Sequence, residues 1–294
     1  MTIHATTLAR AARLAVVALL LASASPAHSA FVPAPLRVAV GQVRGSPDVR
    51  AIVLLEIQRR DDVAVLDPGL VDAALVGSGY DGSLNLTRSE ARRLAQVCGV
   101  EVLVLAVASI VDLGPEAGPD SWDARAGVFV VDGRTGELVH YATLTARGAD
   151  RPAALRQLSG ACRLDIAGWT PTLERIRAGR TGANPVVADA PVLDLVANPE
   201  TAPGESPPRF FRRPHPALTA DAERFRVSAT VDVVVEFKAD GTFGTIDAVR
   251  WAGFGLDEAC IAAIRAEKFF AARRAGHGVD SRALLRFNFT FDDK

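Results

Sequence analysis

Residues 282–291 read Arg-Ala-Leu-Leu-Arg-Phe-Asn-Phe-Thr-Phe, with an apolar side chain at every second position. In a β-strand, successive side chains point to opposite faces of the sheet. The pattern predicts a strand with a buried face formed by Leu285, Phe287, Phe289 and Phe291, and an outward face formed by Leu284, Arg286, Asn288 and Thr290. We expect the sheet that contains this strand to decide the fold of the C-terminal part of the chain.

The segments before this strand supply its expected neighbours. Residues 231–237 alternate between valine or phenylalanine and mostly polar side chains, and a turn at Lys238-Ala-Asp-Gly241 leads into a second strand ending near Trp251. Residues 256–270 have helical spacing, with acidic side chains in the first turn, where they stabilise a helix. Residues 215–294 are therefore predicted to form a small α+β domain, a sheet with one helix.

The first half of the chain predicts a separate domain of the α/β class. A nearly continuous apolar run over residues 100–111 indicates a central strand that is covered on both faces. The other signals are, in order, a strand over 36–43, a capped helix start at Ser46-Pro47-Asp48, a strand over 63–67, a helix over 68–76, a capping box at Thr87-Arg-Ser-Glu90, a hairpin turning at Asp132-Gly-Arg-Thr-Gly136 and a helical stretch over 151–178, interrupted near Gly168. We expect residues 31–178 to form a mixed sheet with helices packed on it.

The first thirty residues have the layout of a secretory signal peptide. Two arginines precede an apolar core over residues 14–24, and Ala27-His-Ser29 precedes Ala30. The apolar core is shorter than the about 20 residues that a membrane-spanning helix needs. We therefore expect residues 1–30 to be removed by cleavage after Ser29 or Ala30, which places the mature protein in the periplasm without stable membrane insertion.

Residues 179–214 are rich in glycine, proline and alanine, a composition typical of a linker. Within them, residues 191–196 are apolar enough to form a short strand. The basic residues Arg209, Arg212 and Arg213 also fall here, and we interpret them as a solvated linker rather than a docking patch.

The composition bounds the class of protein. The chain has 294 residues, 49% of them hydrophobic and 23% charged, with a formal net charge of −1. Loss of the signal peptide makes the charge about −3, which gives no indication of a nucleic-acid partner or of a membrane surface. A length near 300 residues fits two globular domains.

The chain has three cysteines, so one stays unpaired if the other two form a disulfide in an oxidising compartment. Cys98 ends one helical pattern and Cys162 lies in another, so we predict a Cys98–Cys162 disulfide. Cys260 has the spacing of a helical core position and is interpreted as a buried free thiol.

The sequence contains no recognisable catalytic, cofactor-binding or metal-binding constellation. Residues 77–82 fit the pattern G-x-G-x-x-G, but they follow a predicted helix, whereas a dinucleotide site needs them between a strand and a helix. The histidines at 140, 215 and 277 lack ligand partners at metal-binding spacing. We therefore expect a protein that is not an enzyme and has no cofactor. The alternative is an enzyme with a scattered site, for example around the loop 77–86.

Residues 215–294 resemble the TonB C-terminal domain family in the order of their motifs. The matching pieces are the valine-rich strand 231–237, Asp240-Gly241, Leu256-Asp-Glu-Ala-Cys260, Phe269-Phe-Ala-Ala272, Gly276 and Phe287-Asn-Phe289. The sequence departs from the family at Ala271, where proline is usual, and at His215-Pro216, where the family has Tyr-Pro. The resemblance implies a sheet-plus-helix fold that binds extended peptides of envelope proteins.

The first half resembles the periplasmic α/β domains of the CsgG and LpoB type. The residues that carry this resemblance are Gly99-Val-Glu-Val-Leu103 and the hairpin sequence Asp132-Gly-Arg-Thr-Gly-Glu137. It implies a domain that interacts with other proteins of the cell envelope.

Together these observations predict a secreted periplasmic adaptor that binds an envelope protein by β-strand addition to the last strand, with Arg282, Leu284, Arg286, Asn288 and Thr290 as its partner-binding residues. The partner would be an outer-membrane receptor peptide or a second copy of the chain. An alternative is a TonB-type energy transducer for outer-membrane transport, retained by an uncleaved N-terminal anchor. However, the family's membrane anchor has a histidine in its apolar segment, whereas His4 lies outside the apolar core of this chain.

Overall fold

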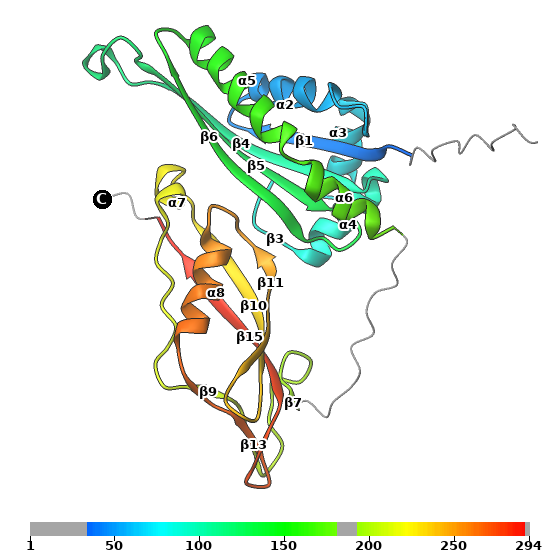
Figure 1. The fold of residues 1–294 in the computed structure, drawn as a ribbon, viewed down its shortest axis with the longest axis vertical. Coiled ribbons are helices and arrows are strands. Elements are labelled where there is room, and N and C mark those ends of the chain that lie inside the picture. Colours follow the sequence, from blue (N-terminus) through cyan, green and yellow to red (C-terminus); the bar gives the residue numbers. More distant parts are fainter. Residues whose placement is uncertain (1–33, 181–192, 292–294) are drawn as a thin grey trace, which may run out of the picture. The chain divides into compact units, whose positions relative to one another are not determined.

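The computed structural model describes residues 34–180 and 193–291 (Figure 1). Apart from Ala34, all of these residues belong to one compact unit, Pro35–Lys294. The predicted signal peptide therefore lies outside the described residues, as do the apolar residues Pro191 and Val192 of the predicted linker. Helices and strands alternate through the first half and are followed by a second sheet, which confirms the predicted combination of α/β and α+β architecture.

The first sheet has five strands in the order β2-β1-β4-β5-β6. Its strands are β1 (Leu36–Arg44), β2 (Val63–Val65), β4 (Val102–Asp112), β5 (Trp122–Asp132) and β6 (Leu138–Gly148). β1 pairs in parallel with β2 and β4, whereas β4, β5 and β6 pair antiparallel, so the sheet is mixed as expected. The apolar strand β4 lies at the centre, and its residues 102–106 are buried, which agrees with the continuous hydrophobic run in the sequence.

Helices cover both faces of this sheet (Figure 1). On one face, α2 (Pro47–Gln58), α5 (Arg151–Ala167) and α6 (Thr170–Ala178) enclose a cluster that contains Val38 and Val104. On the other face, α3 (Pro68–Gly77) and α4 (Arg88–Cys98) pack against the alternate residues of the same strands, such as Ala39 and Leu103. The period-2 alternation of the strands thus divides the interior into two apolar clusters.

Local sequence signals set the helix boundaries. Thr87 accepts a hydrogen bond from the backbone N–H of Glu90, whose carboxylate accepts one from the Thr87 N–H, so the predicted capping box forms. Gly99 ends α4 in the left-handed conformation, with φ of 66°. The predicted interruption near Gly168 separates α5 from α6.

The second sheet has the order β3-β11-β10-β15-β7. Its members are β3 (Leu86–Thr87), β11 (Phe243–Trp251), β10 (Ala229–Phe237), β15 (Ser281–Phe289) and β7 (Leu193–Asp194). The helix α8 (Leu256–Ala266) packs on β10 and β11, and a short helix, α7 (Ala220–Arg224), precedes β10. Phe289 is 9% exposed, and Leu285 and Phe287 pack against the same apolar cluster, so these three residues of the predicted inner face point into the core, while Phe291 lies after the end of β15.

Two segments differ from the sequence-based expectation. The helix expected to reach Phe270 ends at Ala266, because Phe269 and Phe270 form β12 (Phe269–Phe270), which pairs with β9 (Arg209–Phe210). Three short strands within residues 193–210 of the predicted linker are also paired. β7 pairs with β15 as expected for a short strand, β8 (Glu205–Ser206) pairs with β13 (Ala272–Arg274), and β13 pairs with β14 (His277–Val279).

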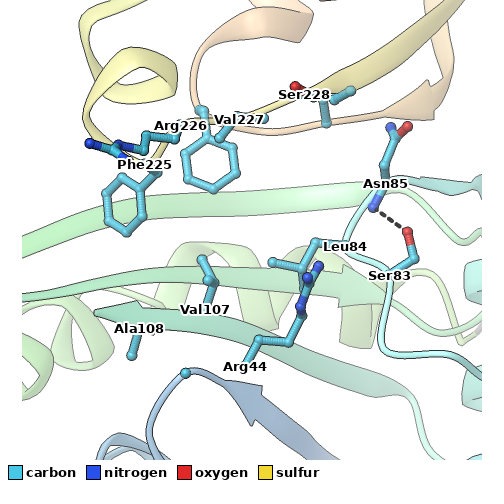
Figure 2. Close-up of a pocket in the computed structure, with 14 residues that line it drawn as sticks. Arg44, Ser83, Leu84, Asn85, Val107, Ala108, Phe225, Arg226, Val227 and Ser228 are labelled. Atoms are coloured by element: carbon cyan, nitrogen blue, oxygen red, sulfur yellow. Dashed lines mark hydrogen bonds between the residues drawn. The ribbon is translucent and has the colours of Figure 1, made fainter. Parts of the chain in front are cut away.

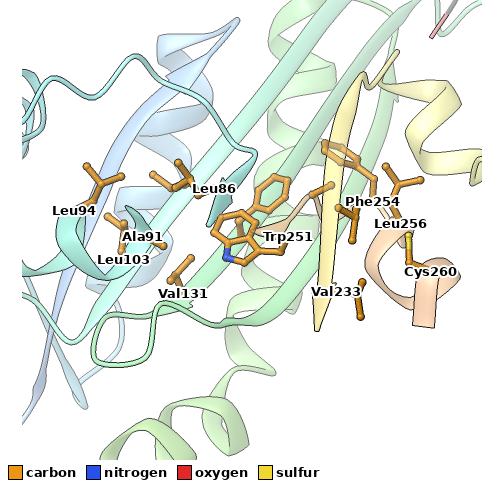
Figure 3. Packing of buried hydrophobic residues seen from close by; sticks show 14 of the residues in the cluster. Leu86, Ala91, Leu94, Leu103, Val131, Val233, Trp251, Phe254, Leu256 and Cys260 are labelled. Atoms are coloured by element: carbon orange, nitrogen blue, oxygen red, sulfur yellow. The ribbon is translucent and has the colours of Figure 1, made fainter. Parts of the chain in front are cut away.

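The cluster on the α3 and α4 face continues into the second sheet (Figure 3). Trp251, 2% exposed, stacks near Phe129 of β5 with ring centroids 6.1 Å apart, and Phe254 meets the same ring edge-on at 5.4 Å. Leu86 and Leu256 belong to the same cluster. The two predicted domains are therefore joined by a common apolar core, while their boundaries at 31–178 and 215–294 stay predictions.

The predicted Cys98–Cys162 disulfide is not formed in the structure. Cys98 packs against the cluster on one face of the first sheet, whereas Cys162 lies in the cluster on the other face, so the sheet separates them. Cys260 is a buried free thiol, as expected. Burial raises the pKa of Cys162 and of Cys260 to about 12, which keeps both thiols protonated and unreactive at neutral pH.

Candidate functional site

The last strand, β15, is held along its whole length by β10. The antiparallel register runs from Ala229 opposite Phe289 to Phe237 opposite Ser281 without interruption. The inward residues Leu285 and Phe287 pack against the apolar cluster under α8. Because β10 pairs with one edge of β15, the other edge of the strand faces away from β10. This second edge is the outer edge of β15.

That outer edge is covered only at its start. β7 runs parallel to β15, with Leu193 opposite Ser281 and Asp194 opposite Arg282. The Leu195 N–H donates to the Arg282 carbonyl at 2.8 Å, and Asp194 forms an ion pair with the Arg282 guanidinium at 2.7 Å. Beyond Arg282, no other described strand pairs with the outer edge of β15.

The alternation of the strand determines which backbone N–H and C=O groups point away from β10 at this open edge. The Arg282 carbonyl points outward, because it accepts the bond from β7. Backbone polar groups of a strand alternate in direction with period two, so the N–H and C=O groups of Leu284, Arg286 and Asn288 point outward as well. The edge from Leu284 to Asn288 thus presents unpaired donors and acceptors, the template on which an additional strand forms.

The structure brings the predicted partner-binding residues onto one face of β15, with Thr290 just after its end, but several of them are engaged within the chain. Arg286 forms two hydrogen bonds, of 2.7 and 3.0 Å, with the buried carboxylate of Asp232 directly opposite on β10. The Thr230 hydroxyl donates to Asn288 Oδ1 at 2.9 Å. Leu284 is 42% exposed. At this site, the backbone groups of the outer edge are therefore open to a partner, whereas the polar side chains stabilise the strand that carries this edge.

The opposite edge strand is more enclosed. β3 pairs with Arg250 and Trp251 of β11, and Arg88 of α4 forms an ion pair with Asp247. The Asn85 side chain, just before β3, donates to the carbonyls of Thr230 (2.7 Å) and Trp251 (2.8 Å) and accepts from the Thr230 N–H (3.0 Å). Sequence reasoning missed this role of Asn85, since nothing local in the sequence signals a contact 145 residues away.

A pocket of about 440 Å³ lies beside the loop 77–86 (Figure 2). Arg44, Ser83 and Leu84 line it together with Phe225 and Val227, and a hydrogen bond joins the Asn85 N–H to the Ser83 hydroxyl at 3.2 Å. No histidine, aspartate or glutamate belongs to its lining. Residues 77–82 begin with the last residue of α3 and lead towards β3, rather than linking a strand to a helix N-terminus, so they lack the geometry of a dinucleotide site.

The structure also assigns partners to a histidine that the sequence left isolated. His140 Nε2 lies 2.9 Å from Asp165 Oδ1, and the second oxygen of this carboxylate accepts a 2.9 Å bond from the Trp169 indole. This arrangement ties β6 to the junction of α5 and α6. Within residues 34–180 and 193–291, no cluster of three or more potential metal ligands occurs. Of the helices described, none is long and apolar enough to span a bilayer.

The sequence matches no protein-family model and no curated protein. Among solved structures, the LpoB C-terminal domain from Salmonella enterica is similar at 14% identity and a TM-score of 0.30, over 45% of this chain and 93% of that one. The TonB C-terminal domain from Pseudomonas aeruginosa gives 20% identity and a TM-score of 0.26, over 30% and 91%. The lipoprotein GNA1162 from Neisseria meningitidis gives 18% and 0.31, over 45% and 99%.

Proposed function

We propose that this chain is a secreted, non-enzymatic adaptor of the periplasm that binds an extended segment of another envelope protein by strand addition to β15. The observation that carries the proposal is the open backbone edge from Leu284 to Asn288, on a strand that β10 and the Arg286–Asp232 pair hold in place. The motif order of residues 215–294, which resembles the TonB C-terminal domain family, agrees with this use of the edge.

Strand addition matches the chemistry of this edge. Backbone hydrogen bonds supply affinity that depends little on the partner's sequence, and side chains on the outward face adjust specificity. The exposed Leu284 offers an apolar contact between the two ion-paired arginines at 282 and 286. In this proposal, the first domain binds a second envelope component, so that the chain links two proteins.

A site-specific photo-crosslinker tests the proposal. The photoreactive residue replaces Leu284 in the full chain, expressed with its own N-terminus, and replaces Leu164 of α5 as the matched control, because Leu164 is exposed at 78% and far from β15 in sequence. We expect a crosslinked product with one envelope protein from position 284 and none from position 164. A homodimeric product from position 284 would identify a second copy of the chain as the added strand.

Substitution of Arg286 by proline provides a second test of strand addition. Arg286→Pro removes an N–H that points outward and that β10 does not use, so β15 keeps its pairing while strand addition is blocked. Arg286→Ala is the control for loss of the ion pair with Asp232. The proposal predicts a crosslink that survives Arg286→Ala and disappears in Arg286→Pro. Equal products at 284 and 164, or a product that survives the proline, would contradict strand addition at this edge.

A further inference from the structure

The ladder between β9 and β12 has two different faces. Phe210 and Phe269 lie opposite each other and point into the core, where both contact Phe237. Phe270 lies opposite Arg209, and the Phe211 N–H donates to the Lys268 carbonyl at 2.9 Å. Because side chains alternate along both strands, Arg209, Phe211, Lys268 and Phe270 share the outward side, which we term the basic aromatic face.

The two outward rings are exposed although they stack on each other. Phe211 and Phe270 have ring centroids 4.2 Å apart at an interplanar angle of 27°. They nevertheless remain 58% and 60% exposed, and they are the only aromatic residues among the strongly exposed large hydrophobic residues of the described chain. Exposed apolar side chains that cluster in this way mark a surface that interacts with another protein or with a membrane.

Four basic residues flank the rings along the two strands. Arg209 and Lys268 are exposed at the two ends of the ring pair, and the exposed Arg212 and Arg213 follow Phe211 directly. None of these four cations forms an ion pair with a described residue, whereas Arg282 and Arg286 on β15 of the five-stranded sheet are both paired. The nearest acidic residue in sequence, Glu267, is half-buried at the end of α8.

The sequence alone favours a solvated linker for Arg209, Arg212 and Arg213, but the structure places them beside two exposed stacked rings. We infer that the basic aromatic face docks the protein on an anionic lipid bilayer. Rings that protrude from the outer side of a ladder can enter the headgroup region, where no complementary pocket is required, while the flanking cations reach the lipid phosphates. Each cation near an anionic membrane surface adds to the attraction, and the effect falls off within the screening length of the salt. This face contains none of the residues of the open β15 edge, so docking and strand addition can be tested with different substitutions.

Vesicle co-sedimentation tests the inference. The protein lacks residues 1–30, because their apolar core would itself bind lipid, and every described helix and strand lies after this point. Vesicles of phosphatidylethanolamine with phosphatidylglycerol are compared with vesicles of phosphatidylcholine alone, at low and at high salt. We expect binding to the anionic vesicles at least about tenfold tighter than to the neutral ones, and its loss at high salt.

Two double variants separate the rings from the charges. Phe211→Ser with Phe270→Ser, and Arg212→Glu with Arg213→Glu, should each weaken binding to anionic vesicles by about tenfold or more. The matched controls are Leu164→Ser, at an apolar residue even more exposed than the two rings, and Arg92→Glu with Arg93→Glu, an adjacent exposed arginine pair on α4. Circular dichroism shows that each variant is folded, and both controls should bind within about twofold of the parent.

Three results would overturn the inference. They are failure of the parent protein to bind anionic vesicles, equal binding to neutral vesicles, and losses in the control variants that match those in the double variants. Binding of an acidic phenylalanine-containing peptide without vesicle binding would assign the face to a protein partner and also reject the bilayer. The crosslink from position 284 tests strand addition separately, so failure of either proposal is visible by itself.

Discussion

The indole N–H of Trp251 in β11 donates a 3.1 Å hydrogen bond to the backbone carbonyl of Gly136, in the hairpin turn between β5 and β6. Both groups are buried, and the two residues are 115 positions apart in the sequence. The bond satisfies the one polar atom of a large apolar side chain at the centre of the common core. The turn of the first sheet therefore helps to position the strand that borders β10 in the second.

Gly136 is the first position at which this relationship can be tested. Its φ is 72°, and a Cβ atom there would collide with the carbonyl oxygen of Arg88. We expect Gly136→Ala to destabilise the protein by about 2 kcal/mol or more, because the strained backbone and the collision act together. Gly160→Ala is the control, since Gly160 lies within α5 with open space around its Cα. Urea denaturation should show Gly160→Ala as neutral or slightly stabilising, and equal effects of the two substitutions would contradict this reasoning.

Asn85 gives a second test of the contact between the two sheets. Asn85→Ala removes three hydrogen bonds and leaves the Thr230 N–H and the carbonyls of Thr230 and Trp251 without their partner. We expect a loss of about 2–3 kcal/mol in the free energy of unfolding, because these part-buried groups would be left unsatisfied, which costs more than the net value of their bonds. Asn288→Ala, which removes one exposed hydrogen bond, should cost less than about 1 kcal/mol. Denaturation midpoints that coincide for the two variants would show that Asn85 does not hold the sheets together.

The parts of the fold that follow from local rules were predictable from the sequence. The Thr87–Glu90 capping box and the alternating face of β15 each depend on residues a few positions apart, and the structure forms both. The end of α8 was not predictable in this way. No glycine or proline stops the helix before Phe270, and it is the packing of Phe269 against Phe210, Phe237 and Phe243 that draws the chain into β12.

Long-range pairing also explains the remaining differences. Residues 193–210 have the composition of a linker, yet β7, β8 and β9 gain partners from strands about 60 to 90 residues later. The two cysteines predicted to pair are both helical and both face the first sheet, but helix spacing does not reveal which face each helix covers. For the candidate site, the sequence identified the strand and its outward residues, while the partial cover by β7 and the engagement of Arg286 with Asp232 required the structure.

From the buried carboxyl group of Asp257, we predict how the free energy of unfolding depends on pH. Asp257 lies in the first turn of α8 and is 7% exposed, and its carboxylate accepts hydrogen bonds from the N–H groups of Ala252 (2.9 Å) and Gly253 (2.8 Å). Burial nevertheless raises the pKa of Asp257 from 3.8 to about 7. A carboxyl group whose pKa is higher in the folded state stabilises the fold most when it is protonated. Its contribution is therefore complete below about pH 4 and is lost as the pH rises through about 7.

Asp257→Asn removes this titration, so the variant isolates its effect from those of the other carboxylates. We expect the free energy of unfolding of the parent, minus that of the variant, to fall by an amount on the order of 1–4 kcal/mol between about pH 4 and about pH 8. Glu258→Gln, at the exposed neighbouring position, should leave the slope of the parent in place. Urea denaturation across this pH range measures all three proteins. Parallel curves for the parent and Asp257→Asn would mean that the buried carboxyl has the same proton affinity in the folded and unfolded chains, and that its two backbone hydrogen bonds offset the cost of burial.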